Sequence, residues 1–190
     1  YDGDINAAVA TKAEVLAKIE SLLDAGYSDL QSAESSEDNE FSFSLSSGFS
    51  GFDTPATFAL FNRGLRARVA VHQDDWSNAQ TALDNCSAWA NSSDPDEGVY
   101  HAFSSGANDQ GNEMFEAADG EYVKLMIHPS HISDADSGDT RVTDNTYIRS
   151  EVITYDELES FIAPTLYSSS YDPVPIMRAV ELQLLQAEVH

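Results

Sequence analysis

Apolar side chains recur at three- and four-residue spacing in three separate stretches of the chain, a pattern typical of helices with one buried face. The central stretch, residues 56–88, contains two such runs separated by the polar tripeptide Gln73-Asp74-Asp75. Either aspartate can accept hydrogen bonds from the free N–H groups at the start of the second run. We therefore predict a helical hairpin over residues 56–88.

Small and large side chains alternate along this predicted hairpin as two closely packed antiparallel helices require. Alanines stand where the helices must approach each other, and bulky residues stand where the gap widens. The residues predicted to form this packing are Phe61, Leu65, Ala67, Trp76, Ala79 and Leu83. Ala67, Trp76 and Ala79 occupy the small, aromatic and small positions of a tetratricopeptide-type repeat. The pattern predicts a mostly α fold with tetratricopeptide-like helical repeats.

A second helix is predicted over residues 11–30. Thr11 and Glu14 have the spacing of a capping box, in which each side chain bonds the other residue's free N–H. Gly26 is a weak point at which this helix can end early. The apolar stripe expected to face the core comprises Val15, Ile19, Leu22, Leu23, Tyr27 and Leu30.

The third helix is predicted over residues 175–190, with Pro175 in its first turn. Ile176, Val180 and Leu184 lie on one face, and further apolar residues widen that face. A helix that is apolar on two sides needs partners on both, and the sequence ends within this pattern. We therefore expect the chain to be a piece of a longer protein, forming a single domain over residues 1–190.

Residues 89–174 are predicted to be rich in loops, because Gly, Asp, Asn and Ser dominate them. Short strands are expected at residues 99–103 and 122–127. Residues 155–162 are predicted to form a short helix after Thr154, with Glu157 at capping distance. Phe41, Phe43 and Leu45 alternate with polar residues, which indicates either a short strand or an extended segment lying on a helix.

The chain is strongly acidic, and this charge limits the partners that it can bind. The 190 residues include 33 Asp and Glu against 9 Lys and Arg, which gives a net charge of −24. A field of that sign repels phosphate backbones, so nucleic acid is excluded as a partner. The acidity fits a protein adapted to concentrated salt or an ordinary acidic extracellular protein. Cys86 is the only cysteine, so it is expected to be a small core residue.

Few residues offer catalytic or metal chemistry. His128 and His131 have a spacing that would suit one metal ion, but the sequence shows no third ligand. Residues 134–139 resemble the start of a calcium loop, yet Asn145 stands where such a loop needs glutamate. No nucleophile motif or phosphate-binding glycine loop is present. We therefore predict a protein that is not an enzyme and has no catalytic residues, metal or cofactor.

Four segments, in order, resemble the SusD/RagB family of outer-membrane nutrient-binding lipoproteins. Residues 11–30 resemble the family helix ahead of its repeat, and LRARVAVHQDDWSNA resembles its LARVYLYxGDWxxA helix pair. Residues 112–115 and Asp139-Thr140-Arg141 resemble its NE-I/M-F and DPR landmarks, with Thr140 in place of proline. PIMRAVELQLLQAE resembles PIIRxxELxLLxAEA. The similarity covers nearly all of this chain, whereas family members are usually longer and begin with a lipidated cysteine.

The resemblance implies a non-catalytic lipoprotein, exposed on the surface of the outer membrane, that captures a glycan or another nutrient. It would pass this ligand to a SusC-like TonB-dependent transporter and would touch the membrane only through a lipid anchor that this chain lacks. The family has no fixed sugar-binding motif, so no ligand residue carries over. Trp89 is our choice for a glycan-stacking residue, because it follows the hairpin and opens a polar loop.

Two other functions remain open at this point. A plain tetratricopeptide-type scaffold would bind a protein or peptide instead of a sugar. A glycoside hydrolase would use two carboxylates held across a cleft, and a chain with 33 acidic residues has many such pairs by chance. Tyr100, Phe103 and Tyr122 are further aromatic residues that could either pack in a core or face a sugar.

Overall fold

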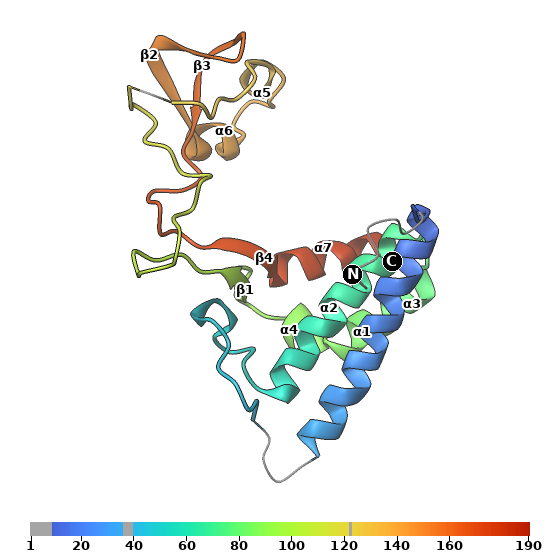
Figure 1. The fold of residues 1–190 in the computed structure, drawn as a ribbon. Coiled ribbons are helices and arrows are strands. Elements are labelled where there is room, and N and C mark those ends of the chain that lie inside the picture. Colours follow the sequence, from blue (N-terminus) through green and yellow to red (C-terminus); the bar gives the residue numbers. More distant parts are fainter. Residues whose placement is uncertain (1–8, 36–39, 122) are drawn as a thin grey trace. The chain divides into compact units, whose positions relative to one another are not determined.

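The computed structural model describes residues 9–35, 40–121 and 123–190, which are mostly helical with a few short strands (Figure 1). The chain forms two compact units. The first contains Tyr1–Tyr100 together with Pro175–His190, and the second contains His101–Val174. The second unit is thus an insertion between the central helices and the last helix, and it corresponds closely to the segment predicted to be rich in loops.

The predicted helical hairpin is confirmed in the first unit. Helix α2 (Pro55–His72) starts at the capping residue Thr54, and helix α3 (Trp76–Asn85) starts at Asp75, whose carboxylate accepts from the backbone N–H of Asn78 at 3.2 Å. The chain reverses at residues 73–75, where Asp74 takes a positive φ of 57°. A short helix, α4 (Ser87–Ala90), follows directly.

Most of the residues predicted to pack inside the hairpin do so. Ala67, Ala79 and Leu83 are fully buried, Phe61 is nearly so, and Leu65 packs against their cluster from its edge. Trp76 is the exception, because 41% of its surface is exposed at the start of α3. Trp89 of α4, and not Trp76, is the tryptophan at the centre of this core.

Gly64 allows Met177 and Trp89 to pack closely against α2. A Cβ atom at this position would lie 2.8 Å from the sulfur of Met177 and 2.9 Å from Cζ3 of Trp89. Both distances are shorter than a van der Waals contact, so only a glycine fits without displacing a neighbour. The close packing of α2 against α4 and the last helix therefore depends on this residue.

Helix α1 (Lys12–Glu34) begins as predicted and ends later than predicted. Its capping box is present, with the backbone N–H of Thr11 donating to Glu14 at 2.8 Å and the backbone N–H of Glu14 donating to the Thr11 hydroxyl at 3.3 Å. The helix continues through Gly26 for two further turns, because its contacts with α2 support this region.

Ionic contacts attach α1 to α2. Arg63 donates to Asp24 at 2.8 Å and lies over the ring of Tyr27, with 4.2 Å from its guanidinium carbon to the ring centre. Arg66 pairs with Glu20 and with Asp24. Both arginine side chains are nearly buried, at 7% and 6% exposed. The apolar stripe that was predicted for α1 is partly wrong, because Val15, Ile19 and Leu22 of that stripe are exposed.

The prediction for the end of the chain was wrong in one respect. Residues Val174–Arg178 form strand β4, which pairs with β1 (Gly98–His101), and helix α7 starts only at Ala179 and ends at Val189. The N–H groups of Ala179 and Val180 donate to carbonyls of residues 97 and 95. Pro175 thus lies in a strand, while α7 packs on α2, α3 and α4.

The segment before α2 is irregular and contains one turn of 3₁₀ helix, η1 (Ser47–Phe49). Residues 41–45 form no strand, and the contact of Phe41 with α2 agrees with the other alternative, a segment that lies on a helix. The ring of Phe41 meets the ring of Phe58 on α2 edge-on, with 5.6 Å between ring centres. Phe49 stacks on the same ring at 5.8 Å. Aromatic packing thus fixes this loop to the hairpin.

The second unit is built on an antiparallel pair of strands, β2 (Thr146–Tyr155) and β3 (Leu158–Pro164). Two short helices, α5 (Ser130–Ser133) and α6 (Thr140–Asn145), precede them. Residues 155–162 were predicted to be helical and instead form the end of β2, the turn and most of β3. Of the two expected strands, residues 99–103 overlap β1, whereas residues 123–127 form no strand and Tyr122 lies outside the described residues.

Candidate functional site

Trp89 cannot stack on a sugar in this structure, which corrects our choice of it as the glycan-binding residue. Only 1% of its surface is exposed, and its indole N–H donates to the carbonyl of Glu97 at 3.0 Å. The rings of Phe52 and Phe61 lie 4.7 and 6.4 Å from it between ring centres. A ring that is covered on all sides and has its one polar atom satisfied is a core residue.

The other predicted aromatic residues do not form a site together. Tyr100 donates its hydroxyl to the carbonyl of Asp96, and burial raises the pKa of Tyr100 above its ordinary value. Phe103 is half-buried, and Tyr122 lies outside the described residues. Neither Tyr100 nor Phe103 lines a described pocket.

The two histidines and the aspartate-rich turn make local bonds. His128 shares a hydrogen bond of 2.9 Å with the hydroxyl of Ser130. Asp139 caps α6 and accepts from the guanidinium of Arg141, which lowers the pKa of Asp139 to about 2. In the described part of the chain, no three potential metal ligands come together. Asp139 and Arg141 therefore form a pair that caps helix α6.

Asn112, the first residue of the NE-I/M-F landmark, ties two loops of the second unit together. It is buried, and its backbone N–H donates to the carbonyl of Ser170 at 2.7 Å while its side-chain amide donates to the carbonyl of Asp172 at 3.1 Å. Its own side-chain oxygen accepts from the N–H of Met114 at 2.9 Å. Both polar atoms of the Asn112 side chain thus hold the loops of the second unit in place.

One pocket of the first unit has aromatic and hydroxyl groups around an open space of about 460 Å³. The loop ahead of α2 forms it, and we call it the serine pocket. Its lining comprises Glu40, Phe41, Phe43, Ser44, Leu45, Ser46, Ser47, Ser50, Asp53 and Thr54. Phe43 is 62% exposed and stacks on Phe41, with 5.3 Å between ring centres and 21° between ring planes.

The serine pocket has the groups that a neutral saccharide requires. A pyranose ring presents a face of C–H groups, which packs on an exposed aromatic ring, and a rim of hydroxyls, which need donors and acceptors. Phe43 supplies the ring, while serine hydroxyls and the exposed carboxylate of Asp53 supply the polar partners. Phe41 holds the ring of Phe43 in place from behind, and Phe41 itself packs on α2.

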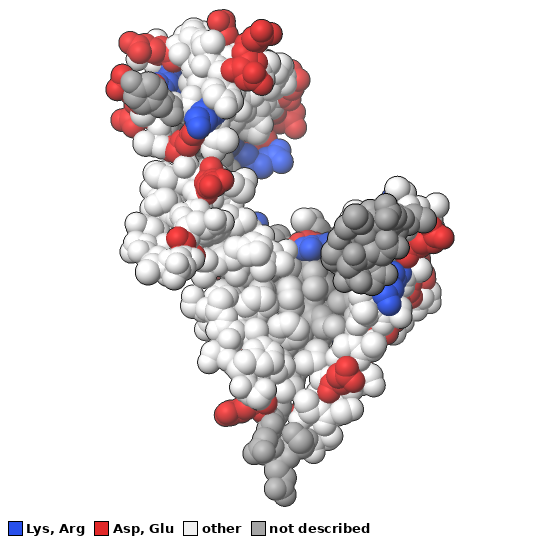
Figure 2. Space-filling view, viewed as in Figure 1, with Lys and Arg blue, Asp and Glu red and all other residues white. Residues whose placement is uncertain are grey.

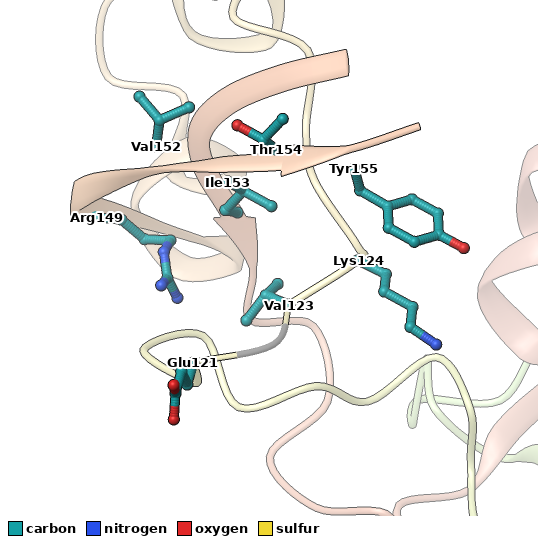
Figure 3. A pocket seen from close by; sticks show the side chains of 8 residues that line it. All are labelled: Glu121, Val123, Lys124, Arg149, Val152, Ile153, Thr154 and Tyr155. Carbon is teal, nitrogen blue, oxygen red and sulfur yellow. The ribbon is translucent and has the colours of Figure 1, made fainter. Parts of the chain in front are cut away.

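A second pocket, of about 420 Å³, lies entirely in the second unit, and we call it the β2 pocket (Figure 3). Five of its lining residues come from β2: Arg149, Val152, Ile153, Thr154 and Tyr155. Glu121, Val123 and Lys124 come from the loop opposite that strand. Val123 and Ile153 are buried and form an apolar floor, whereas Lys124 and Tyr155 are exposed.

The β2 pocket is unusual for its charge. Asp and Glu crowd the visible face of the part that carries β2 and β3, with few basic side chains among them (Figure 2). Two of the nine basic residues of the chain nevertheless line this one pocket, and among the described residues Glu121 is the single carboxylate in the lining. The lining thus contains two basic side chains and the ring of Tyr155, in a unit that is otherwise acidic.

The sequence contained only part of the signal for these pockets. The alternation of Phe41 and Phe43 was visible, but nothing in it showed that Phe43 would be exposed while Phe41 packed on α2. Lys124 and Arg149 are far apart in the sequence and belong to a loop and a strand, so no spacing rule connects them.

No family model, curated protein or solved structure matches this sequence. Within the described residues, none of the helices is both long enough and apolar enough to pass through a membrane.

Proposed function

We propose that this chain is a non-catalytic, SusD/RagB-type binding protein that captures a glycan. In this proposal the ligand is then delivered to a TonB-dependent transporter of the outer membrane. The protein would act at the cell surface, held there by a lipid anchor. The helical hairpin and α7 serve as a stiff frame, and the loops attached to them hold the ligand.

The serine pocket is the observation that carries this proposal. It combines an exposed aromatic face with a run of hydroxyls, and aromatic packing on α2 holds its loop in place. A pocket that is already formed needs little ordering when a ligand binds, which favours binding by a small number of weak contacts. Such a lining suits a neutral sugar better than a peptide, which would need an unpaired strand edge or an apolar groove.

The packing of the hairpin supports a tetratricopeptide-like frame. Ala67 on α2 and Ala79 on α3 are both fully buried, as the close approach of the two helices in such a repeat requires. Helix α1 packs on the other side of α2, and α7 packs on α2 and α3. We propose that α2 and α3 are one repeat of this kind and that the neighbouring helices extend it.

The proposal is tested by calorimetric titration of the full chain with neutral oligosaccharides, followed by chromatography of the recovered sugar. We expect saturable binding with the sugar unchanged. Phe43→Ala should weaken binding about three- to tenfold, because it removes the stacking face, worth about 1 kcal/mol. Phe161→Ala is the matched control, since Phe161 is also exposed but belongs to β3 and is not part of the lining of the serine pocket.

Three results would overturn the proposal. Binding of peptides with no response to any sugar would favour a protein-binding scaffold. Release of shorter sugars, abolished by a single Asp or Glu substitution, would establish a glycoside hydrolase. Equal binding by the Phe43→Ala and Phe161→Ala variants would remove the serine pocket from the account. A gene for a TonB-dependent transporter beside this one would independently support the delivery step.

A further inference from the structure

Arg149 is the one arginine without an ion pair in the described part of the chain. The other five arginines each contact an aspartate or a glutamate: Arg63, Arg66, Arg68, Arg141 and Arg178. In a chain with 33 acidic residues, a carboxylate partner is easy to find. Among the described residues, Arg149 therefore has no carboxylate within 4.0 Å of its guanidinium, although its unit is rich in acidic residues.

Backbone carbonyls hold Arg149 in place instead of carboxylates. Its Nη1 donates to the carbonyl of Ala118 and its Nη2 donates to the carbonyl of Gly120 at 2.9 Å, while its Nε is buried without a hydrogen-bond partner. Carbonyls orient a guanidinium without neutralising it. The guanidinium is thus fixed in direction and keeps its full charge.

An irregularity in the hairpin places this residue at the pocket. Ile148 pairs with Ile162, but the next pair is Ile153 with Ser160, so β2 has extra residues between the two pairs. Arg149 and Val152 belong to this bulged segment, and both line the β2 pocket. Bulges of this kind redirect side chains and are common beside functional sites.

Lys124 adds a second positive charge from the opposite loop. Its Nζ lies 6.0 Å from the centre of the Tyr155 ring, and its side chain is exposed and without an ion pair among the described residues. The carboxylate of Glu116 accepts from the backbone N–H groups of Lys124 and Leu125 at 2.6 and 2.7 Å. The backbone that carries Lys124 is therefore held firmly, while its ammonium group remains available.

We propose that the β2 pocket binds the anionic group of an acidic saccharide, a carboxylate or a sulfate. Arg149 and Lys124 supply the charge, Tyr155 supplies an aromatic face for the sugar ring, and Val123 and Ile153 form the apolar floor beneath it. Figure 3 draws Arg149 and Lys124 at opposite ends of the pocket, on either side of Val123, so an anionic group would contact one of them and the second would add to the positive field. A contact of that kind is a charge-assisted hydrogen bond. The saccharide part of this assignment rests on the proposed function, whereas anion binding itself does not.

Lys124 and Glu121 are exposed charges of opposite sign in the pocket, so removing each should change anion binding in opposite directions. The full chain is titrated by calorimetry with trigalacturonate, a sulfated disaccharide and the neutral sugar maltotriose, at about 0.15 M salt, where charges act over about 8 Å. Lys124→Gln should weaken binding of the acidic sugar about threefold. Glu121→Gln should strengthen it about two- to threefold, because the one carboxylate in the lining is removed. Neither change should alter binding of the neutral sugar.

Lys18→Gln is the matched control, since Lys18 is an exposed lysine on α1 outside the pocket. We expect this variant to bind all three sugars as the parent chain does. If Lys124→Gln and Lys18→Gln have equal effects, net charge explains the result and the inference is wrong. Binding of trigalacturonate but not the sulfated sugar, or the reverse, would identify the anionic group.

Failure of this inference can be told apart from failure of the proposed function. Binding of neutral sugars alone, sensitive to Phe43→Ala, would leave the proposed function intact and contradict the β2 pocket. Binding of acetate or sulfate ions that responds to Lys124 and Glu121, with no sugar bound at all, would confirm an anion site and contradict glycan capture. No response to any acidic probe would overturn the inference outright.

Discussion

Two helical glycines show how differently the same residue type is used in this chain. Gly64 on α2 faces Met177 and Trp89, and a Cβ atom there would overlap both. Gly26 on α1 would bring a Cβ atom only to 3.5 Å from the side-chain nitrogen of Asn62, an ordinary contact. The first glycine is therefore required by packing, while the second only weakens its helix.

Replacing each glycine by alanine should change stability in opposite directions. We expect Gly64→Ala to lower the free energy of unfolding by about 1–3 kcal/mol, the usual cost of overpacking a core. Gly26→Ala should raise it by about 0.5–1 kcal/mol, because alanine favours a helix over glycine. Urea unfolding followed by circular dichroism measures both. Equal destabilisation by the two variants would contradict the packing of Met177 and Trp89 on α2.

Asp172 is a carboxylate whose hydrogen bonds hold a turn of the second unit. It accepts from the backbone N–H of Ser169 at 3.1 Å and from the hydroxyls of Ser168 and Ser169 at 2.9 and 2.8 Å. Hydrogen bonds from the backbone of Ser168, and then from the two hydroxyls, lower the pKa of Asp172 to about 2. Bonds made to the ionised form favour that form.

This lowered pKa predicts how the turn responds to acid. The stabilisation from Asp172 should be complete above the unfolded-state pKa of about 3.9 and should disappear as the pH falls through about 2. Carbonyl NMR titration should therefore give a pKa of about 2 for Asp172. Titration of Asp172 near 4 would show that the serine hydrogen bonds are not formed. Asp172→Asn should remove this part of the acid dependence.

At the scale of elements, α1 is attached to α2 by charge to an unusual extent. Arg63 and Arg66 are nearly buried on α2, and both contact Asp24 of α1. Removing the charge of Asp24 leaves two buried guanidinium groups short of a partner, which costs more than the loss of an exposed ion pair. The apolar residues on the outer side of α1 contribute little, because they remain exposed.

Asp24→Asn should lower the free energy of unfolding by about 1–3 kcal/mol. Asp29→Asn is the matched control, because it removes the same charge from an exposed position of the same helix. We expect this control to change stability by less than about 0.5 kcal/mol. Denaturant titration of both variants gives the comparison. Similar values for Asp24→Asn and Asp29→Asn would show that the ionic contacts do not hold α1.

The elements that the sequence predicted well are those set by local signals. Caps at Thr11 and Asp75 and the buried alanines of the hairpin placed α1, α2 and α3 without knowledge of their partners. Strand β4 escaped prediction because its partner, β1, lies more than seventy residues earlier. The β2–β3 hairpin escaped because its turn residues, Asp156 and Glu157, take positive φ without the usual glycine.

The packing of side chains was harder to predict than the elements. Arg63 and Arg66 of α2 pair with Asp24 and Glu20 of α1, and the predicted apolar stripe of α1 was wrong for Val15, Ile19 and Leu22. Trp89 looked available because it opens a polar loop, yet it is buried, with the rings of Phe52 and Phe61 packed against it. The β2 pocket depends on a strand bulge, which has no signature in the residue pattern.

At the scale of the whole molecule, the chain divides into two compact units. The first unit contains α1 to α4, α7 and the serine pocket, and the second contains the β2–β3 hairpin and the β2 pocket. With 33 acidic residues against 9 basic ones, charge alone would repel an anionic ligand from most of the surface. Under our two proposals the serine pocket would take a neutral sugar and the β2 pocket an acidic one.

The most direct test of glycan capture is an NMR titration of the isotope-labelled full chain with a neutral oligosaccharide. The account predicts that amide shifts change at Phe43 and the adjacent serines, that the amides within α3 stay unchanged, and that the sugar is recovered intact. Shift changes confined to the helices of the hairpin, or the appearance of cleaved sugar during the titration, would contradict it.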